Sequence, residues 1–153
     1  MNNYTSIFTE KSSLTIDSKG KILNLTLNNG NRERTIIKAN PFDPFFSSGN
    51  YLLFPWVNRL KTNKIKFKEL ETVINPIAKD SNNLALHGLI ANSERDFTVL
   101  EESETESKIE FQPKEQLKNF PSLKEIFVLK HDSIEFQIQF SNISNSNQYF
   151  SFG

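Results

Sequence analysis

Three features of this 153-residue sequence predict an all-β fold. Apolar and polar residues alternate with a period of two in several short runs, which is the pattern of half-buried antiparallel strands. Asn, Gly, Ser and Asp cluster between these runs, as expected for turns. Fourteen phenylalanines supply bulky side chains that favour sheets and can fill a core between them. We therefore expect antiparallel sheets that share an apolar core.

The first expected strand covers residues 21–27 and places three leucines on one face: Leu23, Leu25 and Leu27. The turn-forming stretch 28–31 then leads into a partner strand at 32–38, so these segments should form a hairpin. Residues 39–49, with two prolines and a Ser-Ser-Gly, predict an irregular loop that delivers the next segment of the chain.

Five further strands are expected at residues 64–68, 97–102, 108–112, 123–129 and 134–140. The last is the most regular, and its partner should be 123–129, joined through a turn at 130–133. The acidic run 101–106 reads as a solvated hairpin tip. Residues 113–118 begin with proline and continue with good helix formers, which predicts a single short helix.

Composition excludes several classes of function. Eighteen Lys and Arg balance eighteen Asp and Glu, so no basic footprint for nucleic acid or an anionic membrane is present. The absence of cysteine excludes disulfides and thiolate chemistry, and two histidines without clustered acids predict no metal site. No apolar run is long enough for a membrane span, and the N-terminal residues lack a signal-peptide pattern. The expected location is the cytoplasm, with no cofactor.

Two short segments set unlike polar groups into apolar runs: residues 54–60 (Phe-Pro-Trp-Val-Asn-Arg-Leu) and residues 84–89 (Leu-Ala-Leu-His-Gly-Leu). We expect these polar groups to be buried and therefore to need partners. The Arg59 guanidinium and the Asn58 amide offer donors and acceptors in fixed directions, and a neutral His87 offers one of each. Such a set suits a ligand made of neighbouring hydroxyls.

This pattern resembles the aldose 1-epimerase (galactose mutarotase) family, in which an Asn-Arg segment is followed by a Leu-His-Gly segment. Residues 75–76 and 120–121 match two further short elements of the family, and residues 140–153 match the strand before its Gly-x-His-Pro-x-Phe segment. The resemblance covers residues 21–153 and implies a galactose mutarotase-like supersandwich with antiparallel sheets. Residues 1–153 would then form a single, incomplete domain, the N-terminal portion of that fold.

The resemblance implies an isomerase that interconverts the α and β anomers of a hexose such as galactose or glucose by acid/base ring opening. In the family, the acid is the His of the Gly-x-His-Pro-x-Phe segment, and the base is a Glu nearer the C-terminus. The sequence stops at the Gly that begins this segment, Gly153. We therefore expect no catalytic residue in this chain, no mutarotase activity of the chain alone, and a His-Pro codon pair in the DNA downstream.

Carried over by position, Asn58 and Arg59 match the sugar-contacting pair of the family, and His87 matches a His that hydrogen-bonds the substrate. Their implied role is to orient the sugar ring for chemistry done by other groups. Each also has a plainer interpretation: Arg59 could stack on Trp56 or pair with a carboxylate, and His87 could be a core or turn histidine. His131, in a predicted turn, is expected at the surface.

Three alternatives stay open at this point. One is a non-catalytic carbohydrate-binding β-domain, and another is a β-sandwich interaction module with no sugar role. The third is a sugar-phosphate epimerase relative, for which Arg95 and residues 61–64 offer cations. An incomplete sandwich would also leave open strand edges and an uncovered apolar face, so self-association through sheet edges is expected.

Overall fold

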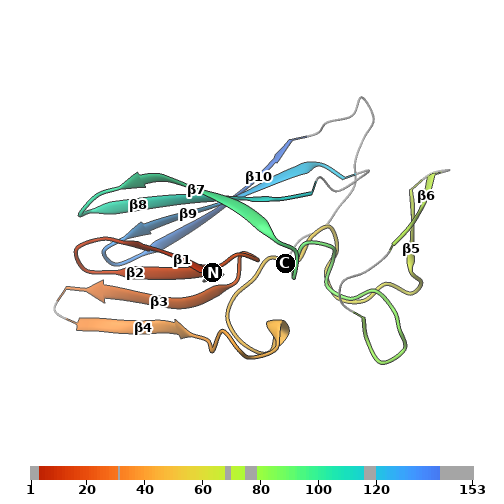
Figure 1. Cartoon of the computed structure of the whole chain (residues 1–153), viewed down its shortest axis with the longest axis horizontal. Helices are drawn as coiled ribbons and strands as arrows, with labels where there is room; N and C mark the ends of the chain where they lie inside the picture. Colours follow the sequence, from red (N-terminus) through yellow and green to blue (C-terminus); the bar gives the residue numbers. More distant parts are fainter. Residues whose placement is uncertain (1–3, 31, 68–69, 75–78, 116–119, 142–153) are drawn as a thin grey trace.

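The computed structural model describes residues 4–30, 32–67, 70–74, 79–115 and 120–141, and they form two four-stranded antiparallel sheets and one hairpin (Figure 1). The first sheet has the order β1 (Tyr4–Phe8), β2 (Ser13–Asp17), β3 (Ile22–Asn29), β4 (Arg32–Lys38). The second has the order β10 (Ile134–Ser141), β9 (Ser122–Lys130), β8 (Glu106–Pro113), β7 (Arg95–Glu102). The separate hairpin pairs β5 (Lys64–Phe67) with β6 (Leu70–Val73), and a 3-10 turn, η1, covers Phe45–Ser47. The prediction of an all-β fold with antiparallel sheets is confirmed.

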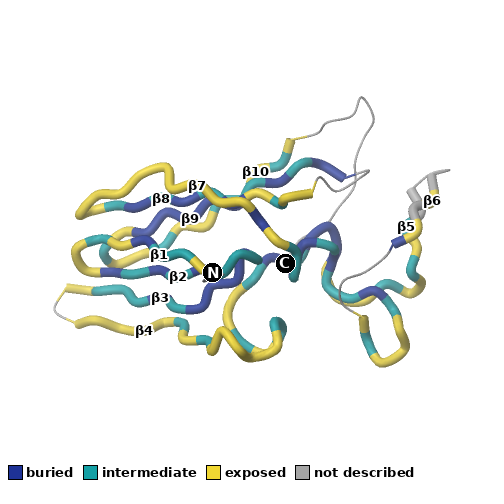
Figure 2. The backbone as a smooth tube through the Cα atoms, viewed as in Figure 1, coloured by how far each residue is buried: buried dark blue, intermediate teal, exposed yellow. Residues whose placement is uncertain are grey.

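The two sheets bury their facing sides against each other. One buried cluster draws on both sheets and contains Ile7, Leu14, Ile16, Ile22, Leu25, Ile109, Phe111, Phe127 and Leu129. Figure 2 shows this buried stretch along β2, β3, β8 and β9, with the outer strands β4 and β7 exposed. Each fully buried Leu, Ile or Phe contributes about 1.5–3 kcal/mol relative to an exposed one, so this cluster is the main source of stability of the sandwich.

Both predicted hairpins are confirmed. β3 pairs with β4 around Gly30, and β9 pairs with β10 around the turn at 131–133. In the second hairpin Phe127 lies opposite Phe136, and their rings stack with centroids 4.8 Å apart. The predicted tip at 101–106 is also exposed, because β7 ends at Glu102 and β8 begins at Glu106.

Three details of the sequence analysis need correction. Leu23 is buried at 6% exposure, but it is not part of the core cluster that contains Leu25. Asn24 and Ile22 lie opposite two consecutive residues of β2, so Leu23 is the extra residue of a bulge. The predicted helix at 113–118 is wrong at its start, since Pro113 ends β8; residues 116–119 lie outside the described part. The strands β1, β2 and β6 were not predicted.

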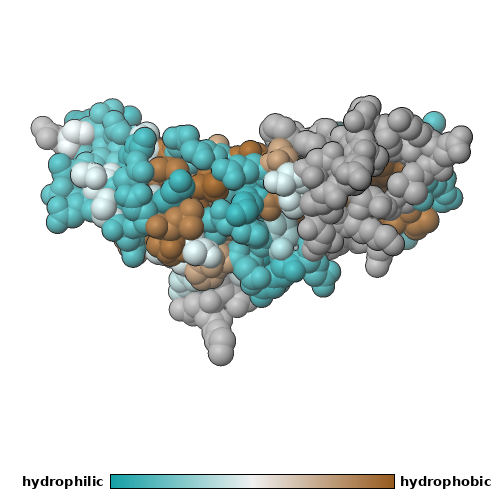
Figure 3. Space-filling view, turned by 90° about the horizontal axis from the view of Figure 1, so that it is seen from above, coloured by the Kyte–Doolittle hydropathy of each residue, from teal (hydrophilic) through white to brown (hydrophobic). Residues whose placement is uncertain are grey.

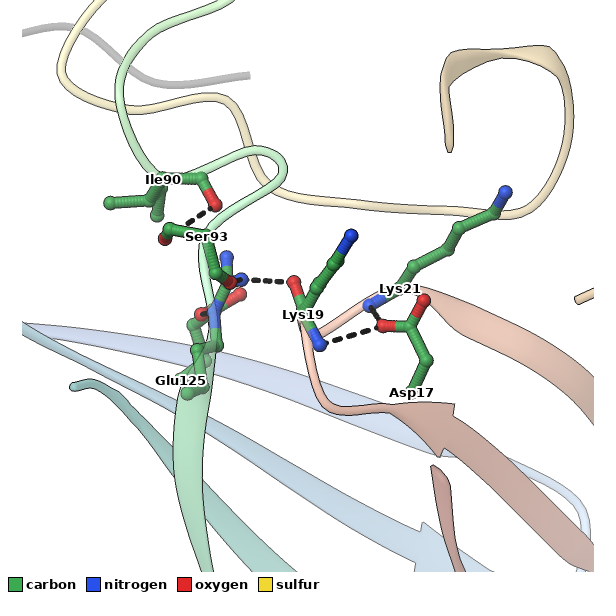
Figure 4. A network of polar contacts seen from close by, with 7 residues as sticks. Asp17, Lys19, Lys21, Ile90, Ser93 and Glu125 are labelled. Atoms are coloured by element: carbon green, nitrogen blue, oxygen red, sulfur yellow. Dashed lines mark hydrogen bonds and ion pairs between the residues drawn. The ribbon is translucent and has the colours of Figure 1, made fainter. Parts of the chain in front are cut away.

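A buried ion pair lies between the sheets. Glu125 points inward from β9 and accepts a charge-assisted hydrogen bond from Arg95 of β7, and both side chains are 0% exposed. Figure 4 shows Glu125, Ser93 and Lys19 converging at this point; the carbonyl oxygens of Ser93 (3.0 Å) and Lys19 accept hydrogen bonds from Arg95 Nη1. Burial raises the pKa of Glu125, and Arg95 opposes that shift. Arg95 is therefore engaged inside the fold, which removes it as a cation for a sugar phosphate.

The outer strands of the two sheets differ in character. β4 is exposed at six of its seven residues and carries four charges, which discourages edge-to-edge pairing. β7 instead exposes apolar residues: Phe97, Val99 and Leu100. Figure 3, which views the molecule from above, shows hydrophobic surface interrupted by hydrophilic side chains. Self-association through sheet edges stays a prediction, and β7 is one of the described edges whose exposed apolar residues favour it.

Candidate functional site

The two motifs picked out in the sequence lie side by side. The amide of His87 donates to the carbonyl oxygen of Asn58 at 2.8 Å, and the amide of Leu60 donates to that of Ala85 at 2.9 Å. Arg59 and Leu86 face each other between these two bonds as an antiparallel bridge. The backbone therefore holds Asn58, Arg59 and His87 within one short ladder, although 27 positions separate His87 from Leu60 along the chain.

A second contact joins Gly88 to Phe54 and explains the glycine. The amide of Leu89 donates to the Phe54 carbonyl oxygen at 2.8 Å, and Gly88 and Phe54 form a parallel bridge. Gly88 has a φ of +82°, and a Cβ at this position would lie 2.2 Å from the Phe54 oxygen. No residue with a side chain fits there without moving the first motif, so a glycine at position 88 is needed for the two segments to approach.

Unusual backbone geometry is concentrated at the predicted site residues. Among the described residues, three that are not glycine have a positive φ: Asn58 (66°), Asn83 (65°) and His87 (62°). A left-handed conformation costs an L-residue about 1–2 kcal/mol, and asparagine tolerates it better than histidine. Such strain persists where the surrounding structure fixes it, and it is enriched at binding and catalytic sites.

The polar groups of the first motif are more exposed than the sequence suggested. Asn58 and Arg59 are exposed, and the Arg59 side chain retains 58% of its accessible surface, so the expectation that they are buried is wrong. The apolar residue beside them is the anchor: Trp56 is buried against Ile74 and Ala85. The motif thus packs its tryptophan inward and presents its amide and guanidinium to solvent.

Arg59 has an ionic partner that the sequence analysis did not name. Its Nε lies 3.6 Å from Asp80 Oδ2, so Arg59 does have the carboxylate contact that its plainer interpretation named. The turn 80–84 fixes Asp80, because Oδ1 accepts hydrogen bonds from the amides of Asn82 and Leu84, each at 2.9 Å. The Asp-Ser-Asn-Asn sequence was a signal for such a turn, but nothing in it indicated a contact with Arg59.

His87 is half-buried beneath the loop that precedes the first motif. Its ring lies 5.3 Å from the ring of Phe46, which itself contacts Tyr51 at 5.4 Å. Burial lowers the pKa of His87, and the nearby positive charge of Arg59 lowers it further. His87 Nδ1 is buried and has no hydrogen-bond partner among the described residues. The lowered pKa keeps the ring mainly neutral at neutral pH, and Nδ1 is a buried polar atom that the described residues leave without a partner.

Other residues singled out in the sequence lie elsewhere. His131 is in the β9–β10 turn, where its Nε2 lies 2.7 Å from the carbonyl oxygen of Glu104. Phe120 and Pro121 are buried, and the Phe120 ring packs 6.4 Å from that of Phe54. Residues 75–76 and the tail 142–153 lie outside the described residues. Lys64 pairs with Glu71 across the β5–β6 hairpin at 2.7 Å, so this cation is engaged as well.

A separate hollow of about 410 Å³ lies beside the first sheet. Lys21, Asp43 and Phe45 contribute to its lining, and the Lys21 ammonium sits 5.4 Å from the centre of the Phe45 ring. Burial lowers the pKa of Lys21, although Asp17 and Asp43 act in the opposite direction. This hollow is a second place where a small molecule could bind, and it shares no lining residue with the paired motifs.

The described ranges contain no group of three or more His, Asp or Glu side chains close enough to hold a metal ion. Within the same ranges, no helix has the length and hydrophobicity that crossing a bilayer requires.

Two solved structures have the same fold as this chain. One is the GalM/aldose epimerase homologue from C. elegans, with a TM-score of 0.56 and 12% sequence identity over 92% of this chain and 47% of that chain. The other is a galactose mutarotase-like protein from Clostridium acetobutylicum, with a TM-score of 0.62 and 18% identity over 87% and 44%. The predicted galactose mutarotase-like fold is thereby confirmed, and the chain spans a little under half the length of either structure. No family model and no curated protein sequence matches the chain.

Proposed function

We propose that this chain is an aldose 1-epimerase-like protein that binds a hexose, such as galactose or glucose, at Asn58, Arg59 and His87. The observation that carries the proposal is the backbone ladder between the two motifs, which brings an amide, a guanidinium and an imidazole together from distant positions. The shared fold is a second support, since the two similar structures are an aldose epimerase homologue and a galactose mutarotase-like protein.

The chemistry of the three groups suits a sugar ring. A guanidinium offers several donors in one plane and can bridge two neighbouring oxygens. The neutral imidazole offers one donor and one acceptor, which matches a hydroxyl that accepts from one neighbour and donates to another. Both sites of positive φ in the ladder hold residues of this set, Asn58 and His87, as expected where a ligand surface constrains the backbone.

In this proposal the three residues orient the sugar and do not transfer protons. Anomer interconversion needs an acid for the ring oxygen and a base for the anomeric hydroxyl. Among the described residues of this surface, Asp80 is engaged with Arg59, and His87 is the group with the orienting role. For this reason a non-catalytic carbohydrate-binding domain is the second candidate function.

A galactose titration followed by amide chemical shifts tests the binding proposal. We expect weak binding, with the shifts concentrated in residues 54–60 and 84–89, because one wall of a concave site buries little of the ligand. Arg59→Gln should abolish these shifts. Lys64→Gln is the matched control, since it removes one exposed positive charge from the β5–β6 hairpin and should leave the titration unchanged.

Polarimetry separates the catalytic from the binding-only role. The 153-residue chain should change the mutarotation rate of freshly dissolved α-galactose no more than buffer does. An acceleration that depends on His87 would contradict the orienting role, since a general acid or base typically contributes about 100- to 10,000-fold.

A further inference from the structure

The most firmly fixed charged group near the paired motifs is Asp80. Its side chain is 7% exposed, although it belongs to a surface turn. Two backbone amides, those of Asn82 and Leu84, donate to its Oδ1, and its own amide donates to the Leu84 carbonyl oxygen at 3.0 Å. These hydrogen bonds hold the carboxylate in a fixed position. A group that pairs with the carboxylate is therefore positioned by it.

The turn that carries Asp80 is itself attached to the second motif. Lys79 pairs with Ala85 as an antiparallel bridge, so 79–80 lies beside 84–87 on the side away from residues 58–60. Asn63 reinforces this arrangement, because its side chain donates to the Asn83 carbonyl oxygen at 2.9 Å and accepts from the Ala85 amide at 2.7 Å. The Asp80 carboxylate and the His87 backbone are thus parts of one hydrogen-bonded unit.

Asp80 Oδ2 is buried and has no hydrogen-bond partner in the described part of the chain, and its nearest cation is Arg59 Nε at 3.6 Å. Contact through Nε uses one of the three guanidinium nitrogens, and the other two carry four further N–H donors. Because Arg59 is 58% exposed, a side chain without this partner would sample many rotamers in solvent. The fixed carboxylate limits that freedom.

The pair also sets the charge of the surface. Asp80 cancels the charge of Arg59, and the cations that the sequence offered for a phosphate are partly engaged elsewhere: Arg95 with Glu125, and Lys64 with Glu71. A dianionic phosphate near Arg59 would therefore lie beside a fixed carboxylate in a partly buried setting, where like charges repel strongly. A hydroxyl group meets no such penalty.

We propose that Asp80 is a positioning residue that holds the Arg59 guanidinium for a neutral sugar and disfavours the corresponding sugar phosphate. The proposal rests on the proposed function, in which Arg59 and His87 contact a sugar. It adds a specificity-determining residue that lies outside both motifs.

The substitution Asp80→Asn separates the two roles of this side chain. An asparagine oxygen can still accept from the amides of Asn82 and Leu84, so the turn is retained while the charge is lost. Asp80→Ser, whose hydroxyl can also cap the turn, serves if the asparagine variant does not fold. Asp132→Asn removes the same charge from the exposed β9–β10 turn and is the control for net charge.

Each protein is titrated with galactose and with galactose 6-phosphate, and the amide shifts of 54–60 and 84–89 are followed. In the wild type and in Asp132→Asn, galactose should bind at least as tightly as the phosphate. In Asp80→Asn the affinity ratio should move toward the phosphate by about 5-fold or more, the effect of one partly screened charge.

The outcomes distinguish this inference from the function on which it rests. If galactose perturbs both motifs but Asp80→Asn leaves the ratio unchanged, the positioning role is wrong and the sugar site stands. A wild type that prefers the phosphate also overturns the inference alone. If neither ligand perturbs the two motifs of the wild type, the sugar site itself is wrong, and the role of Asp80 falls with it.

Discussion

The described residues contain two arginine–carboxylate pairs in opposite settings. Arg95 and Glu125 are 0% exposed and lie between the two sheets, with backbone carbonyl groups around the guanidinium. Arg59 and Asp80 lie on the paired motifs, where only the carboxylate is buried and the arginine is 58% exposed. The first pair has no route to a ligand, whereas the second has a fixed anion and an accessible cation.

The same two side-chain types can therefore serve structure in one place and recognition in another, depending on how deeply the pair is buried. A buried pair is costly to break, because the remaining charge loses its counter-charge in a medium that solvates it poorly. An exposed pair adds little stability, because water screens it. We therefore expect substitutions in the buried pair to change mainly stability, and substitutions in the exposed pair to change mainly ligand binding.

The largest effect is expected for Arg95→Met. It leaves Glu125 buried without its cation and should lower the free energy of unfolding by about 3–5 kcal/mol, measured by urea denaturation at pH 7. The double substitution Arg95→Met with Glu125→Met should recover much of this loss, because no charge remains to be desolvated. Equal destabilisation by the single and the double variant would show that packing, and not charge, accounts for the cost.

The same variant should have a distinctive pH dependence. The pKa of Glu125 is already raised by burial, and removing Arg95 raises it further. Above its ordinary value of 4.5 the unfolded chain loses this proton while the folded chain keeps it, so stability falls as pH rises from there. The difference in free energy of unfolding between the wild type and Arg95→Met should therefore become smaller as the pH is lowered toward 4.5.

An intermediate effect is expected for Gly88→Ala, which acts on the paired motifs through the backbone. A Cβ at this position would lie 2.2 Å from the Phe54 oxygen, at a φ of +82°, so the loss should be about 2–4 kcal/mol. Gly30→Ala is the control, since Gly30 has a φ of +74° and nothing within 4 Å of the added atom. It should cost about 1–2 kcal/mol, and similar losses at both sites would argue against the close approach of the motifs.

A much smaller change in stability is expected for Arg59→Gln. The arginine is mostly exposed, so the pair with Asp80 should contribute less than about 1 kcal/mol to the free energy of unfolding. A loss of stability comparable to that of Arg95→Met would show that Arg59 stabilises the fold as Arg95 does, and the two pairs would then not differ in role.

The smallest effect concerns the titration of His87, which proton NMR of the imidazole can follow. Burial lowers its pKa below 6.5, and Arg59 adds to the shift, so Arg59→Gln should raise the pKa without restoring the ordinary value. Because the unfolded chain takes up this proton more readily, stability should decline as pH falls through 6.5. If the pKa of His87 does not respond to Arg59→Gln, the charge of Arg59 does not act on the imidazole.

Much of the sandwich could be predicted because its strands carry the strongest sequence signal. β10 alternates apolar and polar residues from Ile134 to Phe140, its partner β9 carries a run of buried apolar residues, and the turn between them has the expected polar composition. β1 and β2 were missed because each has only five residues, which is too short for its apolar positions to establish a period. The Leu23 bulge was missed because strict alternation assumes that no residue is skipped in the register.

The candidate site was predictable in its residues but not in its geometry. Asn58, Arg59 and His87 could be named from the two motifs, and their pairing is now explained by the Phe54–Gly88 approach. Asp80 could not be predicted as a site residue, because an aspartate in a turn sequence is already explained by its hydrogen bonds to the turn amides. Its contact with Arg59 depends on how two distant segments pair, and a single sequence carries no record of that contact.

A crystal structure of the chain soaked in galactose would show whether the paired motifs form a sugar-contacting surface. We expect sugar oxygens within about 2.7–3.2 Å of the Arg59 guanidinium and of a His87 ring nitrogen, with Arg59 still beside Asp80. The Arg95–Glu125 pair should be unchanged. Galactose bound instead in the hollow beside Lys21 and Phe45, with Arg59 and His87 free of it, would contradict the account.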